Sequence, residues 1–231
     1  MPRSNYAHRL IEFPDLIFPD EQSYIHRSQW RELFRERIGS IFNEQLIFEI
    51  GCNDAAFLST IAQKNPNTAF IGLDWKVKAI YDAATRVADM KLTNVVLLRA
   101  RAQDIAKIFG PGELDEIWIF HPDPCDREVE LKNRLIAEPF LLAAHETLKP
   151  NGSVHLKTDH AGYYHSVVGV LSMDLLAQRF DLTIASSNYW HDPTAILPTA
   201  HRYFANETTA FERRFMKKRQ PIYYVELRTK P

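Results

Sequence analysis

The 231-residue sequence contains no apolar run that approaches the roughly 18 residues needed to cross a bilayer. Its first residues also lack the apolar stretch of a secretory signal peptide. The only two cysteines, Cys52 and Cys125, give no disulfide framework, and we find no internal repeat or low-complexity segment. These absences argue against a helical membrane protein and a disulfide-stabilised secreted domain. We therefore expect a cytoplasmic protein that makes no membrane contact.

Overall charge is also nearly absent, since the formal net charge is −1. A basic field over the whole chain, which many nucleic-acid-binding proteins carry, is therefore excluded. The charges are unevenly distributed, however. Residues 201–231 hold eight Lys or Arg and three acidic residues, whereas residues 101–150 hold six basic and ten acidic residues. The basic C-terminal segment could still contact phosphates locally.

The hydrophobic pattern predicts a single α/β domain over residues 1–231, because 45% hydrophobic residues suffice for one substantial core. Residues 1–42 should form an N-terminal arm and a helix over 25–42, followed by the main core over 43–231. Seven strands are expected at 46–50, 69–73, 94–98, 116–120, 153–157, 182–186 and 222–228. Helices are expected at 54–64, 76–90, 103–109, 132–148 and 163–180. This alternation predicts a mostly parallel seven-stranded sheet with helices on both faces.

Polar residues and a glycine follow the first two predicted strands. Gly51 would let the backbone turn tightly and leave room for a nucleoside cofactor. Asp74, at the end of the second strand, is placed to accept hydrogen bonds from ribose hydroxyls. A single glycine is a weak signal, and a buried turn glycine followed by a surface aspartate is an equally good interpretation at this point.

Two further carboxylates are expected at the same edge of the sheet. Asp123 follows the fourth strand between Pro122 and Pro124, which fix the backbone on both sides of it. Asp159 follows the fifth strand. An ordinary turn is the simpler explanation for a Pro-Asp-Pro sequence, but two acids on one edge favour a binding site. The evenly spaced His155, His160 and His165 would not share one face, so we expect no metal site.

These features resemble the bacterial tRNA (guanine-N7-)-methyltransferase family over residues 13–229. The most specific features are the ordered motifs Pro-Asp-Pro at 122–124, Thr-Asp at 158–159 and Thr-x-Phe-Glu at 209–212. The other matching blocks lie at 13–16, 48–51, 71–74, 94–98, 148–152 and 213–215. The resemblance implies a Rossmann-like class I methyltransferase fold.

The resemblance also implies a reaction, namely transfer of a methyl group from S-adenosyl-L-methionine to guanine N7 in the tRNA variable loop, which gives 7-methylguanosine. It implies tRNA as the partner, no metal, and a monomer or homodimer. The implied cofactor-binding residues are Glu49, Gly51, Asp74, Arg101 and Asp123, with Asp123 also catalytic. The implied substrate-binding residues are Arg127, Asp159, Thr209 and Glu212.

The sequence departs from the family pattern in three places. The glycine-rich turn keeps its first glycine but has Asn53 and Ala55 at the other two positions, and Asn53 could hold the turn because asparagine tolerates a left-handed backbone. Arg101 stands where the family has an acid, and Glu130 replaces a histidine. Two alternatives therefore remain open: an RNA-binding module that has lost catalysis, or a methyltransferase with a different substrate. Retention of the acids at 123, 159 and 212 favours activity.

Overall fold

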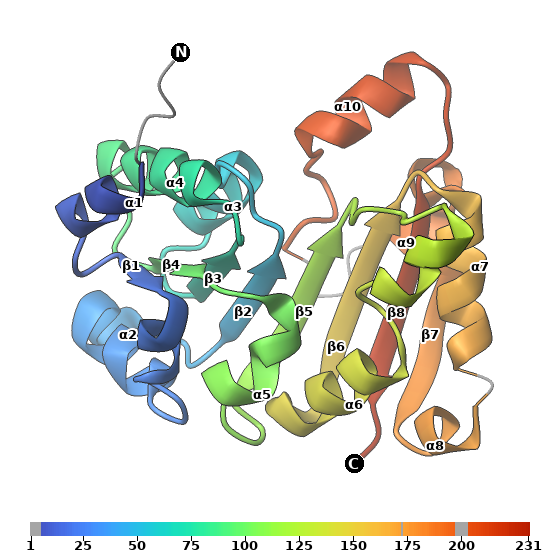
Figure 1. The fold of residues 1–231 in the computed structure, drawn as a ribbon, viewed down its shortest axis with the longest axis horizontal. Helices are drawn as coiled ribbons and strands as arrows, with labels where there is room; N and C mark the ends of the chain where they lie inside the picture. The colour runs from blue at the N-terminus through green and yellow to red at the C-terminus, as the bar shows by residue number, and fades with distance from the viewer. Residues whose placement is uncertain (1–5, 172, 197–202) are drawn as a thin grey trace.

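The computed structural model describes residues 6–171, 173–196 and 203–231, and these form one eight-stranded sheet (Figure 1). The strand order is β1-β4-β3-β2-β5-β6-β8-β7. β8 pairs antiparallel with β6 and β7, and the other strand pairs are parallel. The strands are β1 (Ile17–Pro19), β2 (Leu46–Ile50), β3 (Ala69–Leu73), β4 (Val95–Arg99), β5 (Leu114–Phe120), β6 (Leu148–Thr158), β7 (Phe180–Ser186) and β8 (Tyr223–Thr229).

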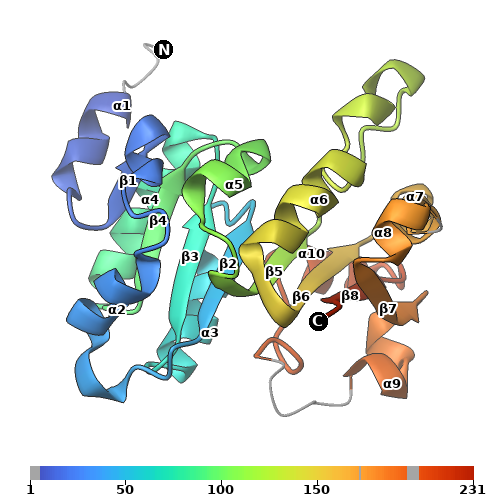
Figure 2. The same ribbon diagram turned by 90° about the horizontal axis from the view of Figure 1, so that it is seen from below.

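Helices cover both faces of the sheet, because alternate strand residues point to opposite sides. In β2, Leu46 and Phe48 lie in one hydrophobic cluster, whereas Ile47 lies in the other. Figure 2 shows α6 and α7 on one side of β6, β8 and β7, and α9 on the other. The α-helices are α1 (Tyr6–Arg9), α2 (Trp30–Ile38), α3 (Ala56–Lys64), α4 (Val77–Asp89), α5 (Ile105–Ile108), α6 (Glu138–Thr147), α7 (Ala161–Val170), α8 (Asp174–Ala177), α9 (Pro193–Ile196) and α10 (Ala210–Lys217).

The predicted α/β fold class is confirmed, but the number of strands is eight rather than seven. The additional strand, β1, lies in the segment expected to be an irregular arm, and it pairs in parallel with β4 through Ile17 and Leu97. Three residues ending in a proline carry little strand signal, and proline is tolerated there because β1 is an edge strand. The N-terminal segment is therefore part of the sheet.

The first long helix is shorter than the periodicity predicted, because α2 begins at Trp30 rather than at residue 25. The backbone N–H groups of Ser28 and Trp30 donate to the buried Glu113 carboxylate at 2.9 and 2.8 Å. Ser28 also has a φ of 68°, which a right-handed helix does not allow. A side chain 83 residues away from Trp30 thus sets the start of this helix.

Two other helices also differ from the predicted ranges. The helix expected over 132–148 begins at Glu138, with Pro139 in its first turn, where proline fits well. A 3₁₀ helix, Glu128–Asn133, precedes it. The helix expected over 163–180 is divided into α7 and α8. At the carboxyl end of the sheet, α10 lies above β5 and β6 (Figure 1).

Candidate active site

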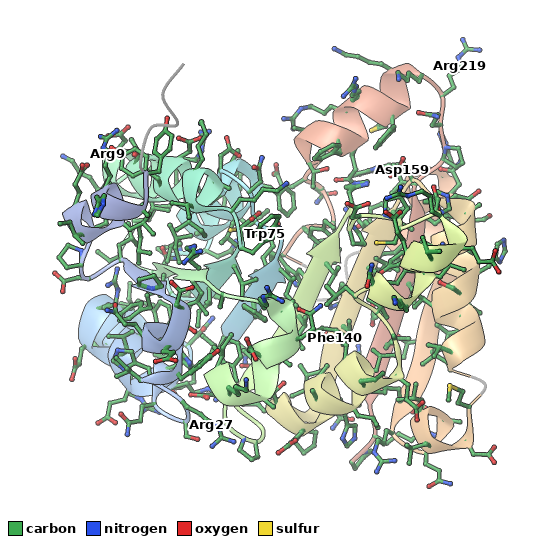
Figure 3. All side chains as sticks on the ribbon, in the orientation of Figure 1. Arg9, Arg27, Trp75, Phe140, Asp159 and Arg219 are labelled. Atoms are coloured by element: carbon green, nitrogen blue, oxygen red, sulfur yellow. The ribbon has the colours of Figure 1, made fainter. Side chains whose placement is uncertain are left out.

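A pocket of about 910 Å³ lies at the carboxyl ends of β2 to β6. In Figure 3, Trp75 lies on the β3 side of this edge and Asp159 lies below α10. The lining includes Gly51, Asn53, Asp74, Trp75, Arg101, His121, Asp123, Asp159, Phe211 and Phe215. Five sequence-predicted site residues therefore border one pocket, as expected for ligand sites in open α/β sheets. They are Gly51, Asp74, Arg101, Asp123 and Asp159.

The turn after β2 keeps a left-handed backbone at all three positions where the family has glycine. The φ angles are 82° at Gly51, 50° at Asn53 and 51° at Ala55. Asparagine tolerates this conformation, whereas alanine adopts it at a cost of about 1–2 kcal/mol. The turn is further held by Gly51 N–H, which donates to the Leu73 carbonyl at 2.7 Å. The path of the backbone therefore survives the loss of two glycines.

Asp74 joins this turn to the beginning of α4. Its carboxylate accepts hydrogen bonds from the backbone N–H groups of Asn53 at 3.2 Å and Lys76 at 2.9 Å. The residue is only 8% exposed, yet it borders the pocket. A carboxylate has about four acceptor sites, so two N–H groups leave capacity for ribose hydroxyls.

Glu49 lies in β2 at 5% exposure and is not among the residues that border the pocket. Its Oε2 atom has no hydrogen-bond partner among the described residues. Burial, together with the nearby charge of Asp54, raises the pKa of Glu49 to about 8. A buried, unsatisfied carboxyl one residue before the pocket-lining Ile50 fits a positively charged group bound nearby, because such a group would stabilise its ionised form.

The loop after β5 presents Asp123 to the pocket. His121 and Cys125, on either side of the Pro-Asp-Pro sequence, both have left-handed φ angles of 53° and 49°. The loop is held at one end by His121 N–H, which donates to the Lys157 carbonyl at 2.7 Å. At the other end, Arg134 Nε donates to the Pro124 carbonyl at 2.9 Å. Asp123 is exposed on a loop that is fixed from two sides.

Asp159 lies beside His121, with 3.5 Å between Asp159 Oδ1 and His121 Nδ1. The neighbouring His121 imidazole lowers the pKa of Asp159, although partial burial acts in the opposite direction. Asp159 is therefore ionised at neutral pH. The pocket that Asp123 borders is thus also lined by a charged carboxylate, and acidic side chains suit a ligand that carries or acquires positive charge.

Three predicted substrate residues do not border the pocket, and their assignment stays a prediction. Arg127 is exposed and pairs with Glu130, so the acid that replaces the family histidine offsets its charge. Thr209 and Glu212 form a capping box at the start of α10. Glu212 is fully buried, and its Oε1 accepts from Lys157 Nζ at 2.9 Å.

The Lys157–Glu212 ion pair lies entirely inside the protein, with both side chains 0% exposed. Burial alone would raise the pKa of Glu212, but the Lys157 charge and the Thr209 N–H outweigh it, so that the pKa is lowered. Sequence reasoning missed Lys157, His121, Phe211 and Phe215. Phe211 lies within the Thr-x-Phe-Glu motif and His121 directly precedes the Pro-Asp-Pro motif, but neither motif shows that the two rings meet. The positions of Lys157 and Phe215 likewise depend on partners distant in the sequence.

The sequence of this chain matches a known protein family over most of its length. A family model described as "Putative methyltransferase" matches residues 43–225. The chain belongs to this family. The resemblance noted from the sequence is confirmed, and this methyltransferase is a divergent member of the tRNA (guanine-N7-)-methyltransferase group.

Curated relatives cover nearly the whole methyltransferase chain. A tRNA (guanine-N(7)-)-methyltransferase of Streptococcus thermophilus is 27% identical, with 99% of this chain and 97% of the relative covered. One from Geobacillus sp. is 25% identical, with 96% and 92% covered. A bifunctional glycosyltransferase/methyltransferase of Fusobacterium nucleatum is 29% identical over 96% of this chain, which spans only 32% of that relative's length.

Solved structures confirm the class I methyltransferase fold. The 16S rRNA methyltransferase KamB matches with a TM-score of 0.62 at 15% identity, with 88% of this chain and 94% of the other covered. A 16S rRNA (adenine(1408)-N(1))-methyltransferase with its cosubstrate SAM matches with a TM-score of 0.56 at 13% identity, covering 87% and 91%. Family and fold together support S-adenosylmethionine as the cofactor, and the Asp74 and Glu49 carboxyls fit it.

The described residues contain neither a candidate membrane-spanning helix nor a candidate metal-binding group. Within residues 6–171, 173–196 and 203–231, no helix combines the length and apolarity that a membrane span requires. In the same part of the chain, no three His, Cys, Asp or Glu side chains are grouped in a way that could hold a metal ion.

Proposed function

We propose that this methyltransferase transfers the methyl group of S-adenosyl-L-methionine to guanine N7 in the variable loop of tRNA, forming 7-methylguanosine. The observation that carries the proposal is the joint placement of Asp74, Asp123 and Asp159 around one pocket. The curated relatives from Streptococcus and Geobacillus, which bear this activity in their names, support the choice of acceptor.

The cofactor half of the pocket is formed by the ends of β2, β3 and β4. Asp74 would accept hydrogen bonds from the ribose, and Gly51 would let the backbone approach the cofactor closely. Glu49 would lie behind the positively charged part of the cofactor, where burial leaves its carboxyl without a partner among the described residues. Arg101, exposed at the pocket rim, would lie near the adenine.

The acceptor half needs carboxylates but no strong base. S-adenosyl-L-methionine supplies an electrophilic methyl group on a sulfonium, and guanine N7 attacks with its own lone pair, so no proton has to be removed first. Methylation leaves the base positively charged. Asp123 and Asp159 would orient the base and stabilise that charge, which is electrostatic catalysis by groups already in place.

RNA binding has a natural location on α10, which lies at the carboxyl end of the sheet (Figure 1) and lines the pocket with Phe211 and Phe215. The helix and the turn after it carry five exposed cations: Arg213, Arg214, Lys217, Lys218 and Arg219. Because phosphate contacts position nucleic acids without reading their sequence, this cluster would guide the RNA backbone past the pocket. Arg127, Thr209 and Glu212 remain proposed substrate-binding residues.

Asp123→Asn tests the proposed role of the central carboxylate. The variant keeps the size of the side chain but removes its charge, so turnover should fall by roughly 10²–10³, as for the loss of one preorganised electrostatic group. Methylation of unmodified tRNA transcripts, detected by N7-sensitive chain cleavage, measures this. The affinity for S-adenosyl-L-methionine should stay nearly unchanged. A fully active variant would show that Asp123 only shapes a turn.

Calorimetric binding of S-adenosyl-L-methionine to the parent protein separates the alternatives. No binding, together with no methylation, would favour an RNA-binding module that has lost catalysis. Binding without methylation of any tRNA transcript would instead indicate a methyltransferase with a different acceptor.

A further inference from the structure

The position of α10 over the pocket is fixed by a contact inside the protein. Glu212, in the first turn of the helix, forms the fully buried ion pair with Lys157 of β6. The Lys157 ammonium also lies 4.1 Å from the centre of the Tyr189 ring. Removing two charges from water is costly unless their geometry is good, so this pair strongly favours one placement of the helix.

Next to Glu212, Phe211 lies at the pocket with half of its surface exposed. Its ring stacks near that of Phe215, with centroids 6.4 Å apart and an interplanar angle of 22°. The His121 ring lies 5.7 Å away at 31°. Phe211 is therefore supported by two neighbouring rings and keeps part of its apolar surface exposed at the pocket.

The same pocket holds Asp123 and Asp159, so an aromatic ring and two acids border the acceptor half together. A flat ring system could stack on Phe211 while the acids contact its polar edge. The aromatic face would also attract a base that becomes positively charged, because the ring quadrupole is negative above its plane. Enzymes that modify bases commonly hold the extruded base by stacking and hydrogen bonds.

We infer that Phe211 is the stacking platform for the acceptor base, and that the buried Lys157–Glu212 pair is the anchor that positions this platform. The inference rests on the proposed function, because it assumes an acceptor base extruded from RNA. It gives Glu212 an indirect role, in which the residue positions Phe211. The acceptor is accordingly a planar base, and a non-aromatic small molecule would gain nothing from the platform.

Three variants on α10 test the platform in the methylation assay. Phe211→Leu keeps an apolar side chain but removes the ring, and it should lower turnover on RNA by about tenfold to a hundredfold, the range for loss of one base–aromatic stack. Phe211→Tyr should retain most of the activity. Met216→Leu, an exposed position on the same helix that does not border the pocket, is the matched control. Affinity for S-adenosyl-L-methionine should not change in any of them.

A fluorescence titration tests, without requiring catalysis, whether a base stacks on Phe211. The probe is 2-aminopurine riboside, whose fluorescence is quenched by stacking, added to protein saturated with S-adenosyl-L-homocysteine. The parent and Phe211→Tyr should quench the probe, and Phe211→Leu should bind it at least fivefold more weakly, judged by the dissociation constant from the quenching curve. Equal quenching by parent and Leu variant, or none by the parent, would overturn the inference. Quenching by a parent that methylates no RNA would refute the proposed function alone.

Discussion

The two halves of the pocket are held by different kinds of contact. In the cofactor half, backbone groups hold the site, since Asp74 accepts from two backbone N–H groups and Gly51 N–H donates to Leu73. In the acceptor half, contacts between side chains contribute as well as backbone hydrogen bonds. Glu212 depends on Lys157, and Asp159 depends on His121. We therefore expect the cofactor half to tolerate substitutions, whereas the acceptor half depends on specific side-chain partners.

This difference explains how the chain can diverge from its family in the glycine-rich turn. Asn53 and Ala55 keep the left-handed backbone that glycine adopts freely. The cost, about 1–2 kcal/mol for alanine, is small enough for the surrounding hydrogen bonds to offset. A side-chain pair has no such tolerance, because removing one buried partner leaves the other charge uncompensated.

The largest effect should follow from Glu212→Gln. The substitution removes the Glu212 charge from the buried ion pair with Lys157, so the free energy of unfolding should fall by about 3–5 kcal/mol. Denaturant unfolding followed by circular dichroism measures the change. Glu207→Gln is the matched control, since its ion pair with Lys64 is partly exposed and should contribute only about 0–1 kcal/mol.

A double variant tests whether the loss of stability comes from the broken ion pair or from the changed shape of the side chains. Replacing both partners, as Lys157→Met with Glu212→Leu, should recover much of the lost stability, because two apolar residues leave no uncompensated charge. If Glu212→Gln unfolds no more easily than Glu207→Gln, the pair does not anchor α10.

The cofactor half should give an intermediate effect. Asp74→Ala removes the acceptor proposed for the ribose and should weaken binding of S-adenosyl-L-methionine by about 1–3 kcal/mol, the range for a charged hydrogen-bond partner. Calorimetry on the folded variant measures it, with Met216→Leu, at a position that does not border the pocket, as the control that should keep its affinity. An unchanged dissociation constant for Asp74→Ala would contradict the ribose assignment.

The sequence predicts the centre of the sheet better than its periphery. The ranges 46–50 and 69–73 match β2 and β3 because these strands are apolar, except for Glu49, and buried on both faces. The start of α2 could not be predicted, since the Glu113 carboxylate that ends the preceding loop comes from a distant segment. Similarly, β1 exists because β4 offers it an edge.

In the candidate site, too, some residues could be predicted from the sequence and others could not. Asp74, Asp123 and Asp159 could be placed at one edge because each directly follows a strand, and parallel strands end together. Lys157 could not be distinguished from an ordinary strand residue. Its role depends on Glu212, 55 residues further along the chain, and on rings contributed by separate segments.

The smallest effect concerns the pH dependence of cofactor binding through Glu49. Its pKa of about 8 means that this buried carboxyl is mostly protonated at neutral pH in the free protein. A cationic cofactor bound nearby would favour the ionised form and lower this pKa, so binding would release a proton. By linkage, the affinity should rise as the pH increases towards 8, by at most tenfold per pH unit, and then level off.

Calorimetric titrations between pH 6 and 9, compared for the parent and Glu49→Gln, isolate this contribution. Any titration of the cofactor itself is common to both proteins, so the difference between their slopes belongs to Glu49. We expect the Gln variant to lose the extra slope and to bind more weakly than the parent above pH 8, where the parent carboxylate is already charged. Parallel pH profiles would show that Glu49 does not face the cofactor's positive charge, and its raised pKa would then reflect burial in the sheet alone.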